Sequence, residues 1–184
     1  MLTFETVDII LLSILKNNSI IKEGNTAFTM RLRIIWPGKT RNQAVRNLQD
    51  LYLKKINRLE KCEIIETKEA RGIAEKFEKK IKTIEGEALE KYLNDGYIIC
   101  LSDRGQEMSS TEFAQFLEKV SSASPSVITF IAGGFLGLEE KILKKAHFLL
   151  ALSKMTFSQE LIRLVLLEQI YRSLTIMKGI HYAK

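Results

Sequence analysis

The sequence Val127-Ile128-Thr129-Phe130-Ile131-Ala132-Gly133-Gly134-Phe135-Leu136-Gly137 indicates how this chain folds. Residues 127–132 form an apolar run of the length of a buried strand, and the run ends in a turn that contains three glycines. A strand that is apolar at nearly every position is typical of a parallel sheet covered on both faces. Because such sheets bind ligands beyond the carboxyl ends of their strands, the glycine turn is a candidate binding loop.

A second candidate loop, Leu152-Ser153-Lys154-Met155-Thr156-Phe157, follows the apolar run 148–151 and precedes a long helical pattern. Its Ser and Thr hydroxyls can cap the following helix, and its Met and Phe side chains could flank a flat aromatic ring such as adenine. A plain tight turn and an ordinary helix cap are the alternatives for either loop taken alone. Together, the two loops predict a cofactor pocket built largely from main-chain groups.

Strands alternate with helices along the rest of the chain, which predicts an α/β fold with a mostly parallel sheet flanked by helices. Thr40 is expected to cap the first helix, and Ser109 with Glu112 forms a capping-box pattern. Residues 102–108 are expected to be a loop. The predicted strands cover residues 31–36, 62–66, 97–101, 127–132 and 148–152, and the predicted helices cover about 41–58, 77–92, 109–120, 139–147 and 159–177.

The length of 184 residues suits one domain with a substantial core. Hydrophobic residues make up 46% of the chain and charged residues 27%, values typical of a folded soluble protein. The apolar run 7–15 is too short to span a membrane and lacks the basic flank of a secretory signal. We expect residues 1–29 to be an N-terminal extension, either an accessory amphipathic segment or sequence upstream of a start at Met30. Residues 30–184 are expected to form a single domain.

The net charge of +6 is concentrated in one part of the chain. Residues 30–96 carry 16 Lys and Arg against 11 Asp and Glu, whereas residues 97–184 carry 10 against 8. A basic half favours an anionic partner such as RNA, and a protein that is merely basic is the alternative. Cys62 and Cys100 lie in apolar runs without a CxxC neighbour, which predicts buried free thiols, a reducing compartment and no metal site.

No Ser-His-Asp or Cys-His arrangement stands out, and His147 is expected to be a core or capping histidine. The glycine turn is not GxGxxG and follows the fourth strand, which argues against the rival interpretation as a nicotinamide-binding oxidoreductase. The helical pattern over residues 159–177 is apolar almost all round, so we expect most of its sides to be buried, often by a second subunit. Charged residues within it are expected to be paired or to lie at a site.

Seven segments together carry a family resemblance: residues 30–35, 85–87, 101–105, 109–114, 133–138, 152–157 and 162–172. Over these segments, in order and without a large gap, the chain from Met30 to Lys184 resembles the ribosomal RNA large subunit methyltransferase H (RlmH) family of the SPOUT superfamily. The resemblance implies a C-terminal trefoil knot, a homodimer whose sites are made from both subunits, and S-adenosylmethionine as methyl donor. It implies methylation of the ring nitrogen N3 of a pseudouridine in 23S ribosomal RNA of the assembled ribosome, in the cytoplasm, without a metal or a membrane.

The resemblance also indicates which residues bind the cofactor and the substrate. The family's cofactor residues correspond to Leu101, Gly133 and the segment from Leu152 through Phe157, in agreement with the pocket expected at the strand ends. A side chain at Gly133 is expected to fill space that the cofactor needs. The candidates for holding the base or its phosphate, or for removing the N3 proton, are Arg163, Glu168, Tyr171, Arg172 and Tyr182.

The C-terminal tail departs from the family pattern. Members usually end in Tyr-His followed by one or two polar residues, whereas Tyr182 is followed by Ala183, and His181 precedes the tyrosine. A protein of the same fold that binds ribosomes without catalysis is therefore the alternative to a methyltransferase.

Overall fold

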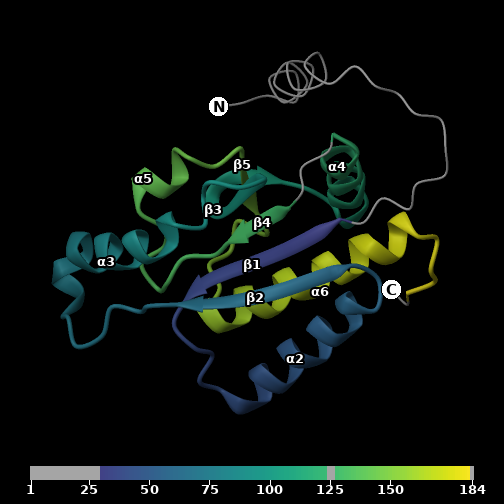
Figure 1. Ribbon diagram of the computed structural model, residues 1–184. Helices are drawn as coiled ribbons and strands as arrows, with labels where there is room; N and C mark the ends of the chain where they lie inside the picture. The colour runs from purple at the N-terminus through teal and green to yellow at the C-terminus, as the bar shows by residue number, and fades with distance from the viewer. Residues whose placement is uncertain (1–29, 124–126, 183–184) are drawn as a thin grey trace.

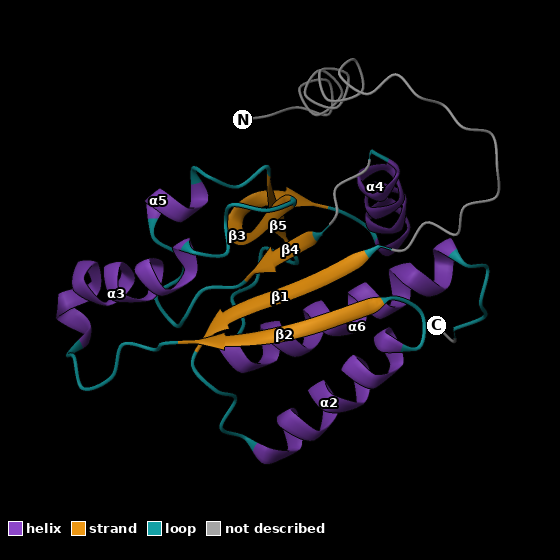
Figure 2. Cartoon of the chain, in the orientation of Figure 1, coloured by secondary structure: helices purple, strands orange, loops and turns teal. Residues whose placement is uncertain are grey.

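The computed structural model describes residues 30–123 and 127–182, which form a parallel sheet between two layers of helices (Figures 1 and 2). The expectations for residues 1–29 and for the last two residues lie outside this range. The strands are β1 (Arg31–Pro37), β2 (Lys61–Thr67), β3 (Tyr97–Glu107), β4 (Ile128–Ile131) and β5 (Phe148–Ala151). The helices are α2 (Gln43–Asn57), the 3-10 turn η1 (Glu75–Phe77), α3 (Glu78–Glu90), α4 (Ser110–Ser122), α5 (Glu140–Leu143) and α6 (Gln159–Met177).

The strand before the glycine turn, β4, lies at the centre of the sheet, whose order is β2-β1-β4-β3-β5. All neighbouring strands run parallel, and Phe130 of β4 pairs with Ile34 of β1 on one side and with Ile99 of β3 on the other. The predicted α/β fold with a parallel sheet is therefore confirmed. Because parallel strands end at one edge, the loops that follow β4 and β5 meet there, beside the part of β3 that continues beyond Leu101.

Alternation along the strands divides the core between the two faces of the sheet. Leu32, Ile34 and Trp36 of β1 point into a core that they share with α2, α4 and α6, whereas Ile35 points into a core shared with α3 and α5. Figure 1 shows α3 and α5 together on one side of the sheet, away from α2 and α6. Burial on both faces explains why β4 is apolar at almost every position.

The prediction of a loop over residues 102–108 is wrong, because β3 continues to Glu107. Leu101 and Gln106 both pair with Leu150 of β5, and the chain between them bulges. At Gly105 the two backbones approach closely, since an added Cβ would lie 2.6 Å from the carbonyl carbon of Leu150. Residues 102–107 lack an alternating pattern, so this pairing is a tertiary effect that local sequence does not predict.

Two further local predictions are corrected, and one is confirmed. The N-cap of α2 is Asn42, whose side chain accepts a hydrogen bond from the N–H of Val45, whereas Thr40 is buried. The helix expected over residues 139–147 is limited to Glu140–Leu143. The capping box at α4 is present with both of its hydrogen bonds. Among the described residues, no helix combines the length and the apolar character needed to cross a bilayer.

Candidate functional site

A cavity of about 780 Å³ lies at the carboxyl edge of the sheet, where the bulge of β3 after Leu101 meets the loops after β4 and β5. This volume is in the range that encloses a drug-sized ligand or a cofactor. Of the eight residues expected to bind the cofactor, seven line the cavity, and the exception is Lys154. The Lys154 side chain is 66% exposed, and its ammonium lies 3.9 Å from Glu107. The seven are Leu101, Gly133, Leu152, Ser153, Met155, Thr156 and Phe157.

The glycine turn forms one wall of the cavity because its backbone folds tightly on itself. The N–H of Gly137 donates to the carbonyl of Gly134 at 3.0 Å, and Gly137 has a φ of +79°. A Cβ on Gly133 would lie 2.5 Å from the carbonyl carbon of Gly137 and 2.8 Å from the nitrogen of Leu138. The expectation that a side chain here would fill ligand space is corrected, since the turn's own main chain occupies that space.

The loop after β5 contributes a second wall and leads directly into α6. Ser153 accepts a hydrogen bond from the N–H of Met155 at 2.9 Å, which fixes the first turn of this loop. The helix cap is Ser158, which accepts from the N–H of Leu161, so neither Ser153 nor Thr156 caps α6 as expected. The N-terminus of α6 thus lies at the cavity, and its dipole favours a negatively charged group there.

Charged side chains surround the mouth of the cavity. Lys82, Asp103 and Arg104 all line it, and Arg104 forms an ion pair of 2.9 Å with Glu140. The Glu140 hydrogen bond raises the pKa of Arg104, which therefore stays a cation at neutral pH. Met155, which also lines the cavity, is 76% exposed.

Arg163 lies apart from the other predicted substrate residues, because it is buried in the core beside β1. It is 1% exposed, and it donates to the carbonyls of Pro37 at 2.6 Å and Gly38 at 3.4 Å. Its guanidinium also stacks over the Trp36 ring at 5.1 Å. Burial lowers the pKa of Arg163 to about 10, so it remains charged at neutral pH. We therefore assign it to holding the end of β1, not to binding an RNA phosphate.

The remaining four predicted residues gather in one cluster, which we call the tyrosine cluster, at the C-terminal half of α6. Tyr182 packs edge-on against Tyr171 at 5.0 Å and lies under the guanidinium of Arg172 at 4.6 Å. Arg172 forms an ion pair of 2.6 Å with Glu168. The hydroxyl of Tyr182 lies 3.2 Å from that of Tyr52, and this hydrogen bond raises the pKa of Tyr182 to about 12.

Sequence reasoning missed two members of the tyrosine cluster, Tyr52 and Lys55 of α2. The ammonium of Lys55 lies 5.3 Å from the ring centres of Tyr52 and Tyr171 and 5.8 Å from that of Tyr182. A cation that faces three aromatic rings draws the tail against α2 and α6. The i, i+3 spacing of Tyr52 and Lys55 along α2 was the available signal.

The tyrosine cluster is far from the cavity of its own chain. Ile162 lines the cavity, and Tyr171 follows nine residues later on the same helix, which corresponds to roughly 13 Å of helix. Tyr171 thus lies about two and a half turns of α6 beyond Ile162, and Glu168 lies less than two turns beyond it.

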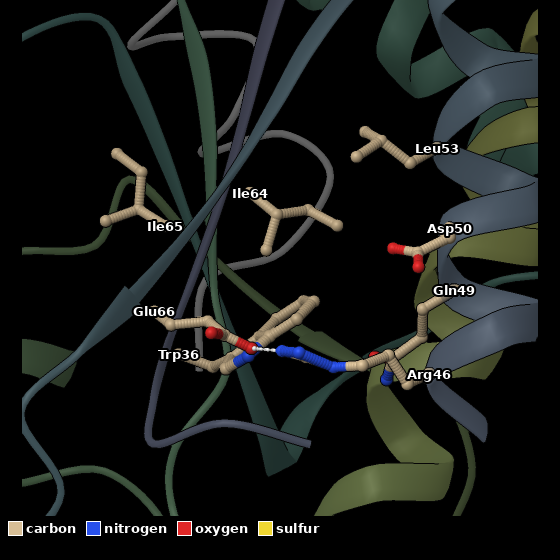
Figure 3. A pocket seen from close by; sticks show the side chains of 8 residues that line it. All are labelled: Trp36, Arg46, Gln49, Asp50, Leu53, Ile64, Ile65 and Glu66. Atoms are coloured by element: carbon tan, nitrogen blue, oxygen red, sulfur yellow. Dashed lines mark hydrogen bonds and ion pairs between the residues drawn. The ribbon is translucent and has the colours of Figure 1, made fainter. Parts of the chain in front are cut away.

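A second cavity, of about 470 Å³, lies between α2 and β2 (Figure 3). The ion pair of Arg46 with Glu66, 2.8 Å long, spans it, while Asp50 and Leu53 point from α2 toward β2. Trp36 lines this cavity, and its indole N–H has no hydrogen-bond partner. None of the predicted cofactor or substrate residues lines it.

Neither of the two cavities is lined by Cys62, Cys100 or His147. Cys100 is buried and Cys62 half-buried, neither is in a disulfide, and burial raises the pKa of both thiols to about 12. His147 is exposed, so the expected core position is wrong; its Nδ1 accepts a hydrogen bond from the N–H of Ile98 at 3.0 Å, and its ring stacks on Tyr97. Within residues 30–123 and 127–182, no three His, Cys, Asp or Glu side chains are grouped so as to hold a metal ion.

Comparison with known proteins identifies relatives along nearly the whole described chain. Residues 30–183 match the family described as "Predicted SPOUT methyltransferase". A ribosomal RNA large subunit methyltransferase H of Alkaliphilus oremlandii is 41% identical over 159 residues, which cover 84% of this chain and all of the relative. A protein of the same name from Clostridium kluyveri is 38% identical over the same coverage.

Among solved structures, a probable methyltransferase from Bordetella pertussis superposes with a TM-score of 0.50 at 13% identity. The superposition covers 80% of this chain and 96% of the other. At this level of identity the likeness concerns the fold alone.

Proposed function

Because this chain belongs to the SPOUT methyltransferase family, together with the ribosomal RNA large subunit methyltransferase H proteins, we propose that it transfers a methyl group from S-adenosylmethionine to 23S ribosomal RNA. The proposed acceptor is the ring nitrogen N3 of a pseudouridine in the assembled ribosome. The observation that carries the proposal is the cavity of about 780 Å³, which gathers both candidate loops at the carboxyl edge of the sheet.

The residues around this cavity suit a sulfonium nucleoside. The turn at Gly133 and Gly134 exposes main chain without side chains, so a ligand can approach its N–H and carbonyl groups closely. Met155 and Phe157 offer apolar surfaces to an adenine ring, and the N-terminus of α6 offers a positive dipole to a carboxylate. When bound, S-adenosylmethionine supplies an electrophilic methyl group.

The chain's own part in the reaction is to position the acceptor and to assist loss of its proton. An N3 atom aligned within about 3–3.5 Å of the methyl carbon gains much of the rate enhancement through proximity alone. We propose that Glu168, Tyr171, Arg172 and Tyr182 face the RNA. Arg172 would offer its positive charge to a phosphate, while its Nε and one terminal nitrogen donate to Glu168 in the free chain.

A second copy of this chain would bring the tyrosine cluster to a cavity. Within one chain, Tyr171 lies roughly 13 Å and Glu168 roughly 9 Å along α6 from Ile162 at the cavity. Large apolar side chains are exposed on the helices that would meet: Leu48 and Leu51 of α2 are 44% and 46% exposed, and Leu161 and Ile176 of α6 are each 42% exposed. We propose a homodimer in which the tyrosine cluster of one subunit faces the cavity of the other. The trefoil knot and the cytoplasmic location implied by the family resemblance belong to the same proposal.

Mass spectrometry of ribosomal RNA from a strain that lacks this gene tests the function. We expect one methylated pseudouridine of 23S RNA to become unmethylated and to return when the gene is restored. An unchanged modification pattern would contradict the proposal and would favour a ribosome-binding protein without catalysis.

A further inference from the structure

Glu85 of α3 carries a carboxylate that is almost entirely enclosed, although Glu85 does not line the cofactor cavity. It is 4% exposed, and its Oε1 accepts a hydrogen bond from the N–H of Ala70 at 3.3 Å. Burial raises the pKa of this carboxyl group; Glu69 raises it further, while the Ala70 hydrogen bond and the charge of Arg163 lower it. Because enclosing a carboxylate is costly, its position needs a structural reason.

The second carboxylate oxygen of Glu85 lies directly against the glycine turn. A Cβ on Gly134 would be 2.5 Å from Oε2 and 3.1 Å from Cδ of Glu85. Gly134 both lines the cavity and accepts the hydrogen bond from Gly137 that closes the turn. Glu85 therefore supports the turn from α3, at the residue that closes it.

A reciprocal contact joins the same two elements. The carboxylate of Glu139, just after the turn, lies where a Cβ on Gly86 would be, and it accepts a hydrogen bond from the hydroxyl of Thr83 at 3.2 Å. Glu85 of α3 thus packs against Gly134 of the turn, and Glu139 after the turn packs against Gly86 of α3. The two contacts fix the separation between α3 and the turn.

The hydrogen bond from Ala70 attaches a third segment, residues 68–71, to this arrangement. Glu69 in that segment forms ion pairs with Arg41 at 3.1 Å and Arg71 at 2.9 Å. The side chains of both arginines are about two-thirds exposed. Glu85 thus contacts both a wall of the cavity and a basic surface segment that does not line the cavity.

We propose that Glu85 is a positioning residue that holds the glycine turn in its cofactor-binding conformation and couples cofactor binding to the basic segment 68–71. The identity of the cofactor in this inference rests on the proposed function. The proposed role depends on the shape of the Glu85 side chain and not on its charge. The side chain packs against Gly134, and the N–H of Ala70 needs only an acceptor oxygen.

Calorimetry with S-adenosylmethionine and four proteins tests the positioning role. We expect Glu85→Ala to bind at least 10-fold more weakly than wild type, and Glu85→Gln, which keeps the shape and an acceptor, to bind within threefold. Glu87→Ala, an exposed neighbour in the same helix, is the matched control and should bind like wild type. Should the alanine variant not fold, Glu85→Asp withdraws the carboxylate from Gly134 and carries the same expectation of weaker binding. Unchanged affinity in a folded Glu85→Ala or Glu85→Asp protein would overturn the inference.

A double variant separates this contact from a direct clash with the cofactor. Gly134→Ala places a methyl group against the Glu85 carboxylate, which is too enclosed to swing away, and should weaken binding at least 10-fold. Adding Glu85→Ala vacates that space, so the double variant should bind more tightly than Gly134→Ala alone. A double variant that binds no better would show that the contact does not set the turn.

Hydrogen exchange distinguishes a failure of this inference from a failure of the proposed function. In ligand-free protein, Glu85→Ala should speed amide exchange both at residues 68–71 and at residues 133–138, whereas Glu87→Ala should not. With S-adenosylmethionine, exchange at residues 68–71 should slow in wild type and not in Glu85→Ala. Wild-type protein that does not bind the cofactor refutes the proposed function, while equal ligand-free exchange in the two variants refutes the role of Glu85.

Discussion

The substitution Gly133→Ala should disable the cofactor cavity without unfolding the protein. The new methyl carbon would lie 2.5 Å from the carbonyl carbon of Gly137, 2.8 Å from the nitrogen of Leu138 and 2.9 Å from the α carbon of Gly137. All three are main-chain atoms, so the turn itself must move by about 1 Å to restore ordinary van der Waals contact. Overpacking of this kind costs about 1–3 kcal/mol of stability, and a displacement of about 1 Å in a binding wall can cost about 100-fold in function.

Calorimetry and thermal unfolding measure the two effects separately. We expect affinity for S-adenosylmethionine to fall by about 10- to 100-fold, with cooperative unfolding retained. Gly179→Ala is the matched control, because Gly179 has a φ of +63° with open space around it and lies beyond the far end of α6. It should lose about 1 kcal/mol of stability through backbone strain and keep wild-type affinity. A Gly133→Ala protein with unchanged affinity would refute the account of the turn.

Three further predictions concern groups outside the cavity. Arg163→Met should lower the free energy of unfolding by about 2–4 kcal/mol, because the carbonyls of Pro37 and Gly38 lose a buried donor. Urea unfolding measures this change, and a loss below about 0.5 kcal/mol would contradict the structural role of Arg163. Desolvation by the groups packed around it lowers the pKa of His147 below its ordinary 6.5, so the unfolded state takes up the proton first and stability should fall as pH drops below about 6.5. His147→Gln should flatten this slope of stability against pH, and an equally steep slope would argue against the role of His147. Cys100, whose pKa is raised to about 12, should resist iodoacetamide at pH 8 until the protein unfolds, and rapid labelling of native protein would be inconsistent with its burial.

Much of the fold was predictable because local pattern and tertiary structure agree. The apolar run before the glycine turn became β4, and the helical pattern over residues 159–177 became α6 with the same bounds. Ser109 and Glu112 formed the expected capping box, since such a motif depends on residues only three apart. The loops expected at the cavity followed from the rule that parallel strands end at one edge.

The errors arose where distant parts of the chain decide the conformation. Residues 102–107 are extended because β5 pairs with them, and their own sequence carries no strand pattern. Arg163 looked like a substrate residue from its helix, but the Pro37 and Gly38 carbonyls that it binds lie more than a hundred residues earlier. The contact between Glu85 and Gly134 likewise joins two motifs that sequence could identify but could not bring together.

A crystal structure of this protein with bound S-adenosylmethionine would show where the cofactor lies. We expect one cofactor molecule to occupy the cavity at the carboxyl edge of the sheet and to contact both the turn at residues 133–137 and the loop at residues 152–157. A cofactor bound elsewhere, for example in the cavity between α2 and β2, would contradict it.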